Sequence, residues 1–279
     1  MRTFFCLLAA AGLALTQTRP TIFLITDAEG VGGVCRQDQV EPSNREMQQL
    51  LTAEINAAVE GFYKGGAGEV IVWDGHDGSQ TLSTLTIHPR AKLVMGGLSP
   101  SMLMERRFAA VAIVGQHSKA NIRAGIMAHS YSSLGIQTMK LNNKPVGEID
   151  VIAAMAGHFD TPIIMLSGDK AAVEEMREIV PDAEFAAVKE GLGRYVCISE
   201  SAKRSQEMIE QAAMRSIAKL GKIKPYRVPG PCTLEIEYTT RNSLPIGSEL
   251  RTWAEVLDDR TIRFRGKDVL EVWQRYRVR

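Results

Sequence analysis

Short apolar segments alternate with amphipathic segments along most of this chain, and this alternation constrains the fold more than any other feature. Residues 21–26 (TIFLIT) and 69–73 (EVIVW) are typical of strands that are buried on both faces of a parallel sheet. Between them, apolar residues recur at helical spacing over residues 47–62, after a capping box at residues 43–46 (SNRE) and before a Gly-Gly pair that ends the helix. This order predicts a right-handed βαβ unit.

The alternation continues through the middle of the chain. We predict further strands at residues 109–114, 136–141, 162–166 and 184–188, and helices at residues 149–159, 171–180 and 201–220. Strands that alternate with helices are typical of a parallel sheet covered on both faces. Residues 19–222 are therefore predicted to form an α/β domain, a three-layer sandwich around a mainly parallel sheet.

The pattern changes after residue 222. Residues 222–231 contain three prolines, and this composition is typical of a linker. Apolar and polar residues then alternate over residues 234–238, as in a strand with one solvated face. A strand at residues 261–264 and a helix at 267–276 follow. We therefore predict a second, smaller α+β domain over residues 223–279.

The first residues have the order of a secretory signal peptide. Arg2 supplies a positive charge, residues 3–15 are almost wholly apolar, and small and polar residues follow. The apolar run is too short to span a bilayer. We expect residues 1–18 to be a signal peptide and the mature protein to be periplasmic or secreted. It would be cytoplasmic if the segment were not cleaved, and a buried first helix or strand is the alternative.

The composition predicts a packed core and no strongly charged surface. Hydrophobic residues make up 45% of the 279 residues and charged residues 23%, so a core is expected rather than disorder. A net charge of +1 argues against nucleic acid, or a membrane after signal cleavage, as the main partner. Cys35, Cys197 and Cys232 form no C-x-x-C pair, which excludes the usual cysteine metal and redox motifs. One disulfide among them would leave an odd thiol.

Three predicted strands end in residues that suit metal binding. Asp27 and Glu29 follow the first strand, and His76 follows the second. His117 follows the strand at residues 109–114. In open parallel sheets, ligands bind in the crevice beyond the carboxyl ends of the strands. We therefore expect these side chains to point at one crevice.

Carboxylates that lie two residues apart favour a divalent cation. If the backbone stays extended past Thr26, Asp27 and Glu29 share a face and repel one another unless a cation binds between them. Histidine is the commonest metal ligand, and carboxylates accompany it at catalytic zinc sites. The alternatives are an acidic loop that only caps the next helix and histidines that only occupy surface turns.

Two further residues extend the candidate site. Glu148 begins a predicted helix, where it could be only a first-turn acid that interacts with the helix dipole. His129 lies in the segment GIMAHS, where it could be only a hydrogen-bonded loop residue. No carboxylate accompanies His88 or His158 at a strand end, and we interpret these two residues as structural.

In order and spacing, these motifs resemble the zinc-dependent D-aminopeptidase family, the DppA-type metallopeptidases formerly called dipeptide transport proteins. The resemblance runs from about Thr21 to the C-terminus and so covers nearly all of the mature chain. The matching segments are D-A-E-G at residues 27–30, D-G-H at 74–76, G-Q-H at 115–117, M-A-H-S at 127–130 and N-N-K-P-V-G-E at 142–148.

The resemblance implies a centre that holds two zinc ions per subunit. Asp27 would bridge both ions. Glu29 and His76 would complete one site, and His117 and Glu148 would complete the other.

The resemblance also implies a catalytic role for His129, as a nucleophile or a base beside the metals. Hydrolysis would use metal-activated water. Family members combine the α/β fold with a second, smaller domain and assemble into a ring-like homo-oligomer that admits only small peptides. The signal-like segment departs from the cytoplasmic members, which leaves the compartment and the physiological substrate open.

The sequence thus predicts a dinuclear zinc aminopeptidase that hydrolyses short peptides or amides with an N-terminal D-amino acid such as D-alanine. Another two-metal hydrolase, such as a phosphoesterase or an amidohydrolase, is compatible with the same ligands. A non-catalytic periplasmic dipeptide-binding protein is a second alternative, although it needs no acids and imidazoles at strand ends. An α/β domain whose polar strand ends only solvate loops is the third.

Overall fold

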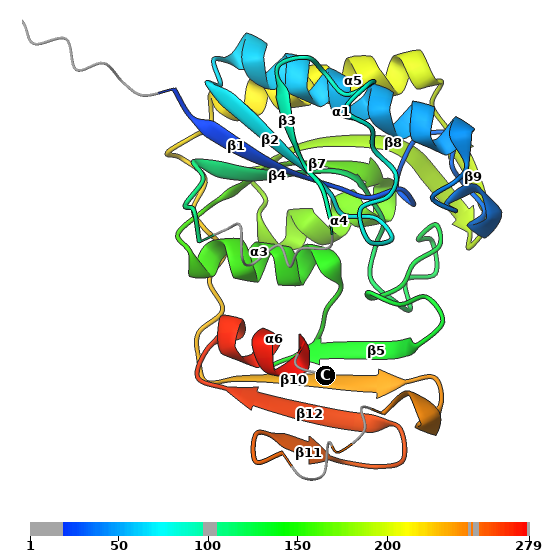
Figure 1. Ribbon diagram of the computed structural model, residues 1–279, viewed down its shortest axis with the longest axis vertical. Helices are drawn as coiled ribbons and strands as arrows, with labels where there is room; N and C mark the ends of the chain where they lie inside the picture. The colour runs from blue at the N-terminus through cyan, green and yellow to red at the C-terminus, as the bar shows by residue number, and fades with distance from the viewer. Residues whose placement is uncertain (1–18, 97–104, 245–246, 248–250, 278–279) are drawn as a thin grey trace, which may run out of the picture.

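The computed structural model describes residues 19–96, 105–244, 247 and 251–277 (Figure 1). The expected signal peptide, residues 1–18, lies outside the described residues. Within the described part of the chain, no helix combines the length and the apolar character that a membrane crossing requires.

A seven-stranded sheet forms the centre of the larger domain, in the order β3-β2-β1-β4-β7-β8-β9. Neighbouring strands are parallel except for β8 and β9, which form an antiparallel hairpin. The strands are β1 (Thr21–Thr26), β2 (Glu69–Asp74), β3 (Ala91–Val94), β4 (Ala110–Gln116), β7 (Ile163–Asp169), β8 (Glu184–Gly193) and β9 (Val196–Ser199).

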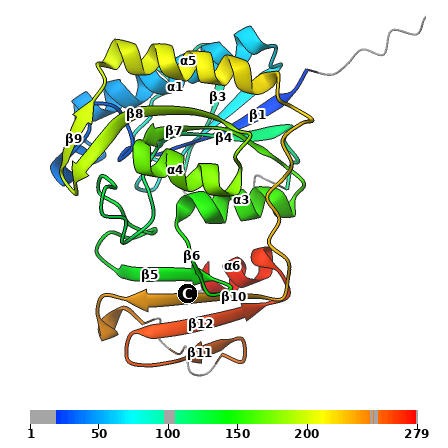
Figure 2. The same ribbon diagram turned by 180° about the vertical axis from the view of Figure 1, so that it is seen from behind.

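The central strands are buried because helices cover both faces of the sheet (Figures 1 and 2). Every residue of β4 and β7 is buried, which explains their nearly continuous apolar sequences. Helices α1 (Arg45–Gly65) and α5 (Ala202–Ile217) cover one face. Helices α3 (Glu148–His158) and α4 (Lys170–Ile179) cover the other. The predicted three-layer α/β fold is confirmed.

Helix α1 begins one residue later than the predicted capping box implies. Asn44, not Ser43, is the N-cap, and its side-chain oxygen accepts a hydrogen bond from the backbone N–H of Met47 at 3.0 Å. Both residue types cap helices well, so sequence alone did not separate them. At the other end Gly66 adopts a left-handed conformation with φ of 106°, as the Gly-Gly pair predicted.

A second sheet, antiparallel throughout, forms the smaller domain in the order β11-β12-β10-β5-β6. Alternate residues of β10 are buried, because one face of this sheet is solvated. The described residues also form two short 3₁₀ helices, η1 (Gln37–Gln39) and η2 (Arg241–Ser243). The elements of the smaller domain are β5 (Ile136–Leu141), β6 (Lys144–Pro145), β10 (Cys232–Tyr238), β11 (Ala254–Val256), β12 (Thr261–Gly266) and α6 (Val269–Arg277).

The smaller sheet contains strands from the middle of the chain as well as from residues 223–279. Strand β5 pairs with β10, with Leu141 opposite Leu234 and Met139 opposite Ile236. A division of the chain at residue 222 therefore does not coincide with the division between the two sheets. Strand patterns report burial but not the partner strand, so the sequence did not reveal this pairing.

Candidate metal centre

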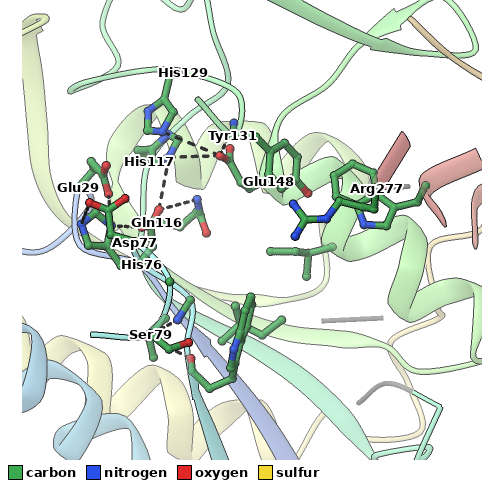
Figure 3. Close-up of a pocket in the computed structure, with 18 residues that line it drawn as sticks. Glu29, His76, Asp77, Ser79, Gln116, His117, His129, Tyr131, Glu148 and Arg277 are labelled. Atoms are coloured by element: carbon green, nitrogen blue, oxygen red, sulfur yellow. Dashed lines mark hydrogen bonds and ion pairs between the residues drawn. The ribbon is translucent and has the colours of Figure 1, made fainter. Parts of the chain in front are cut away.

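The candidate site lies beyond the carboxyl ends of three adjacent strands. Strand β1 lies between β2 and β4 and is parallel to both, so the chain reverses its direction of strand addition at β1. Ligand sites of open α/β sheets form at such switch points. Asp27 follows β1, His76 follows β2, and His117 follows β4 directly. Figure 3 shows His76 and His117 in one region of the site, and the Asp27 carboxylate lies within 3.3 Å of both.

The two carboxylate oxygens of Asp27 face different histidines. Oδ1 lies 3.2 Å from Nδ1 of His76, and Oδ2 lies 3.3 Å from Nε2 of His117. The side-chain amide of Gln116 donates a hydrogen bond to Oδ2 at 3.0 Å. This placement orients Asp27 between two halves of the cluster.

The two glutamates lie on opposite sides of Asp27. Glu29 Oε2 lies 3.2 Å from Nδ1 of His76. Glu148, the first residue of α3, places Oε1 3.8 Å from Nε2 of His117 and 4.0 Å from Nε2 of His129. The structure therefore brings together all five predicted ligands and the predicted catalytic histidine.

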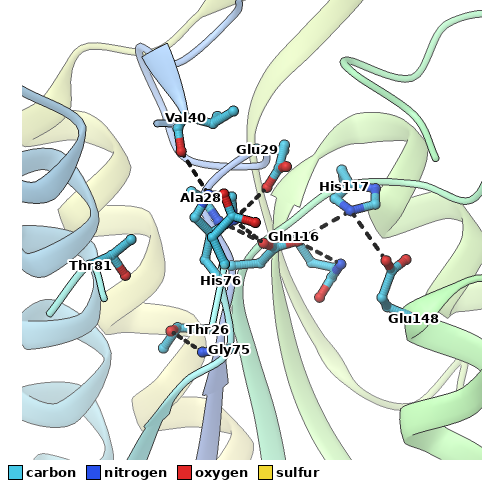
Figure 4. Close-up of polar contacts among 12 residues, drawn as sticks. Thr26, Ala28, Glu29, Val40, Gly75, His76, Thr81, Gln116, His117 and Glu148 are labelled. Carbon is cyan, nitrogen blue, oxygen red and sulfur yellow. Dashed lines mark hydrogen bonds and ion pairs between the residues drawn. The ribbon is translucent and has the colours of Figure 1, made fainter. Parts of the chain in front are cut away.

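Each histidine of the cluster is oriented by a backbone carbonyl, and Figure 4 shows the contact of His76 with Val40. A carbonyl oxygen can only accept a hydrogen bond, so the ring nitrogen beside it carries the proton. A bound metal would replace the proton on the other ring nitrogen, which faces the carboxylates, and this arrangement is usual for metal-binding histidines. The donor pairs are His76 Nε2 with Val40 O at 2.7 Å, His117 Nδ1 with Ser118 O at 2.8 Å, and His129 Nδ1 with Met127 O at 2.9 Å.

The cluster has a strongly negative potential. Burial disfavours a charged His76, but its contacts with Asp27 and Glu29 outweigh burial and raise its pKa to about 12. His117 is buried as well, yet Glu148 and Asp27 raise its pKa to about 9. Burial raises the pKa of Asp27, and the two histidines lower it well below the usual range. The site therefore favours positive charge in a buried place, which a divalent cation would supply.

Unsatisfied oxygens also fit a cation. Oε2 of Glu29 and Oε2 of Glu148 are buried and accept no hydrogen bond. Buried carboxylate oxygens are costly unless a donor or a metal compensates them. Two sets of ligand atoms lie within 4.8 Å of one another: Asp27, Glu29 and His117 in one, and His117, His129 and Glu148 in the other. A set of oxygen and imidazole ligands suits catalytic zinc, and these residues fit it.

Asp74 differs from the other acids at the strand ends. Its carboxylate accepts hydrogen bonds from the backbone N–H groups of Thr81 and Leu82 at 2.7 and 2.9 Å. It therefore holds the loop that follows His76 rather than joining the cluster. His88 and His158 do not line the site either. Nε2 of His88 lies 3.2 Å from Oε2 of Glu60 instead.

A buried lysine, which the sequence analysis missed, supports the loop that carries Glu29. Lys189 on β8 is 3% exposed, and its ammonium donates to the carbonyl oxygens of Glu29 and Val31. On the same loop, the N–H of Gly32 donates to Glu54 at 2.8 Å. A lysine within the apolar segment AAVKEG was the available signal, since charged residues are rarely buried without partners.

Cys35 and Cys197 are neighbours in the structure, whereas Cys232 is remote from them. Burial and the neighbouring thiol of Cys35 raise the pKa of Cys197 to about 11. The two segments meet where the N–H of Gly33 donates to Ser199 Oγ at 2.8 Å. Cys232 lies in the other sheet. Among the described residues, all three thiols are free.

Gly115 allows Asp27 and His117 to approach each other. It has φ of 79°, and a Cβ at this position would lie 2.1 Å from the carbonyl oxygen of Asp27. We expect Gly115→Ala to lower the free energy of unfolding by about 1–3 kcal/mol and to reduce zinc content, because the backbone must move. Urea denaturation and elemental analysis measure both effects. Gly193→Ala is the control, since a Cβ there meets nothing within 4 Å; equal effects of the two substitutions would contradict the prediction.

The five predicted ligands and His129, here called the metal cluster, form one side of a cavity of about 430 Å³ (Figure 3). All six predicted site residues line it. The lining residues that the sequence analysis did not identify include Tyr131, Trp273 and Arg277. The last two come from α6, and their neighbourhood depends on how the two domains pack, so no local signal could have indicated them.

Comparisons with known proteins agree with the resemblance of the motifs. The family model for D-aminopeptidase matches residues 21–278. A D-aminopeptidase of Bacillus subtilis (strain 168) is 28% identical over 265 residues, which cover 91% of this chain and 94% of the relative. A solved structure, the Zn-dependent D-aminopeptidase DppA from Bacillus subtilis, described as a self-compartmentalizing protease, has a TM-score of 0.82 at 27% identity and covers 91% of this chain and 94% of its own. The chain therefore belongs to the D-aminopeptidase family of peptidases, as its motifs predicted.

Proposed function

We propose that this protein is a dinuclear zinc aminopeptidase that removes N-terminal D-amino acids such as D-alanine from short peptides or amides. Family membership and the names of the two relatives support a zinc-dependent D-aminopeptidase. The observation that carries the dinuclear proposal is the placement of Asp27, whose Oδ1 and Oδ2 face two different histidines. A carboxylate placed in this way can bridge two ions.

In this proposal each zinc ion has its own pair of residues beside the shared Asp27. Glu29 and His76 would hold one ion, because Nδ1 of His76 lies 3.2 Å from Oδ1 of Asp27 and 3.2 Å from Oε2 of Glu29. His117 and Glu148 hold the other ion, because they lie together on the Oδ2 side. When bound, the two zinc ions would supply Lewis acidity toward a carbonyl group and lower the pKa of water.

His129 is the proposed catalytic residue. Its Nδ1–H donates to the carbonyl of Met127, so in the neutral imidazole the lone pair is on Nε2, which is directed toward the cluster. The ring stacks on His117 with centroids 4.0 Å apart, so its orientation is fixed. A fixed imidazole with a free lone pair can accept a proton from the attacking group and return it to the leaving amine. Its Nε2 is close enough to Glu148 to be a zinc ligand instead, which the substitutions in the Discussion test.

The size of the cavity supports a small substrate. A volume of about 430 Å³ lies at the lower end of the range usual for small-molecule sites. We further propose export through the signal-like segment, an action on D-alanyl peptides from cell-wall turnover, and a ring-like homo-oligomer with restricted access. The description of the Bacillus subtilis structure as self-compartmentalizing supports the oligomer.

Two measurements on the purified full chain test the proposal. Elemental analysis should find two zinc ions per chain, and D-alanyl amides should be hydrolysed faster than L-alanyl amides. Phosphate esters serve as the comparison substrate for another two-metal hydrolase. Turnover of the esters alone would exclude the peptidase, whereas tight dipeptide binding without turnover by zinc-loaded protein would indicate a binding protein.

A further inference from the structure

The smaller domain forms the side of the cavity that faces the metal cluster. Helix α6 packs against α3, the helix that begins with Glu148. Through this contact, α6 contributes Trp273 and Arg277 to the lining of the cavity. Figure 3 shows Arg277 on the side opposite Glu29 and His76, with its side chain extended into the cavity.

Arg277 is the only lysine or arginine among the described residues that line this cavity. No carboxylate of the described chain forms an ion pair with its guanidinium, whereas Arg275, two residues earlier, pairs with Glu271 at 3.0 Å. A guanidinium with five N–H donors is thus available at one end of a cavity whose other end holds carboxylates. The cavity has opposite charges at its two ends.

Aromatic contacts hold this end of α6 in place. The rings of Tyr131 and Trp273 have centroids 4.8 Å apart, and Trp273 packs on Tyr276 at 5.1 Å. The backbone N–H of Tyr131 donates to Glu148 Oε1 at 2.5 Å. The helix that carries Arg277 is therefore linked to Glu148 through Trp273 and Tyr131.

We propose that Arg277 binds the C-terminal carboxylate of a peptide of two or three residues, so that the smaller domain selects substrates by length. This inference rests on the proposed function, because it names the substrate class of the same site. The C-terminal carboxylate of a short peptide suits a bidentate guanidinium, and the N-terminal residue with its scissile bond would lie at the zinc-loaded end of the cavity. An extended peptide spans at most about 3.3–3.6 Å per residue, so only a short one can place both ends within the cavity.

The carboxylate itself is the group to vary in the test. We compare kcat/KM of the zinc-loaded full chain for D-Ala-D-Ala and for D-Ala-D-Ala amide, which differ only in the C-terminal charge. A hydrogen bond to a charged group changes an affinity by about 10- to 100-fold. We therefore expect kcat/KM to be higher for the free acid than for the amide by this factor. The difference should lie in KM, since the carboxylate is bound equally in the ground state and in the transition state.

Three substitutions at two positions of α6 separate a binding role from a structural one. Arg277→Gln should reduce the preference for the acid to about 1-fold, with kcat for the amide unchanged, and Arg277→Lys should restore part of it. Arg275→Gln, which removes an equal charge outside the cavity, should leave the ratio as in the wild type. A wild type without preference for the acid, or an equal loss for acid and amide in Arg277→Gln, would overturn the proposal.

A binding measurement separates this proposal from the aminopeptidase proposal. Calorimetry on zinc-loaded His129→Ala protein should show tighter binding of D-Ala-D-Ala than of its amide by a similar factor. If neither compound is hydrolysed by the wild type but the acid still binds more tightly, the carboxylate site stands and the aminopeptidase proposal fails. Hydrolysis of both compounds with equal affinities would support the aminopeptidase and exclude a carboxylate site at Arg277.

Discussion

Replacing Asp27 with Asn should abolish zinc binding at both proposed sites and lower kcat/KM by on the order of 10⁴-fold or more. Asparagine keeps the shape of the side chain but loses the negative charge. The carboxylate of Asp27 is the group that lies within 3.3 Å of both His76 and His117. Because one residue serves both halves of the cluster, the loss should affect two ions rather than one. Zinc per chain by elemental analysis and turnover of a D-alanyl amide measure the effect.

Asp77→Asn provides the matched control for Asp27→Asn. Asp77 lines the same cavity and carries the same charge, but its side chain is 64% exposed and lies 3.8 Å from Nε2 of His76, the nitrogen that bonds to Val40. This variant should retain two zinc ions and most of its activity. If Asp27→Asn keeps one ion, Asp27 does not bridge, and the two sites are independent.

His117→Ala and His129→Ala should both be inactive, but only His117→Ala should lose metal. His117 Nε2 lies between Asp27 and Glu148, so its removal should reduce zinc from two ions toward one. The His129 ring stacks on His117, and its Nε2 lies 4.0 Å from Glu148, farther than the His117 nitrogen lies from Asp27. Its removal should lower kcat by about 10²- to 10⁴-fold, the range of general acid–base catalysis, and leave the zinc in place. Zinc analysis and single-turnover kinetics on the same preparations distinguish these outcomes.

His158→Ala completes this comparison as a histidine substitution outside the site. His158 ends α3 and packs edge-on against Phe159, with ring centroids 4.9 Å apart. This variant should keep both zinc and turnover, at a modest cost in stability. Equal zinc loss in His117→Ala and His129→Ala would instead place His129 among the metal ligands, an outcome consistent with its grouping with His117 and Glu148.

Local sequence patterns predicted most of the larger domain. The apolar segment TIFLIT became β1, and the helical spacing after residue 43 became α1. The short edge strands β3 and β9 were missed because their residues are mostly exposed or half-buried, so no buried apolar segment marks them. Burial patterns identify central strands better than edge strands.

The sequence by itself determined which residues have metal-binding chemistry and that four of them follow three parallel strands, because strand ends are local features. Their convergence with Glu148 was predicted only through the family motif. Only the tertiary structure decided that β5 joins β10, that Lys189 supports the loop of Glu29, and that α6 brings Arg277 to the cavity. These contacts join segments far apart in the chain. The periodicity of apolar residues indicates which face of a helix or strand is buried. The packing between elements decides which other residues that face contacts.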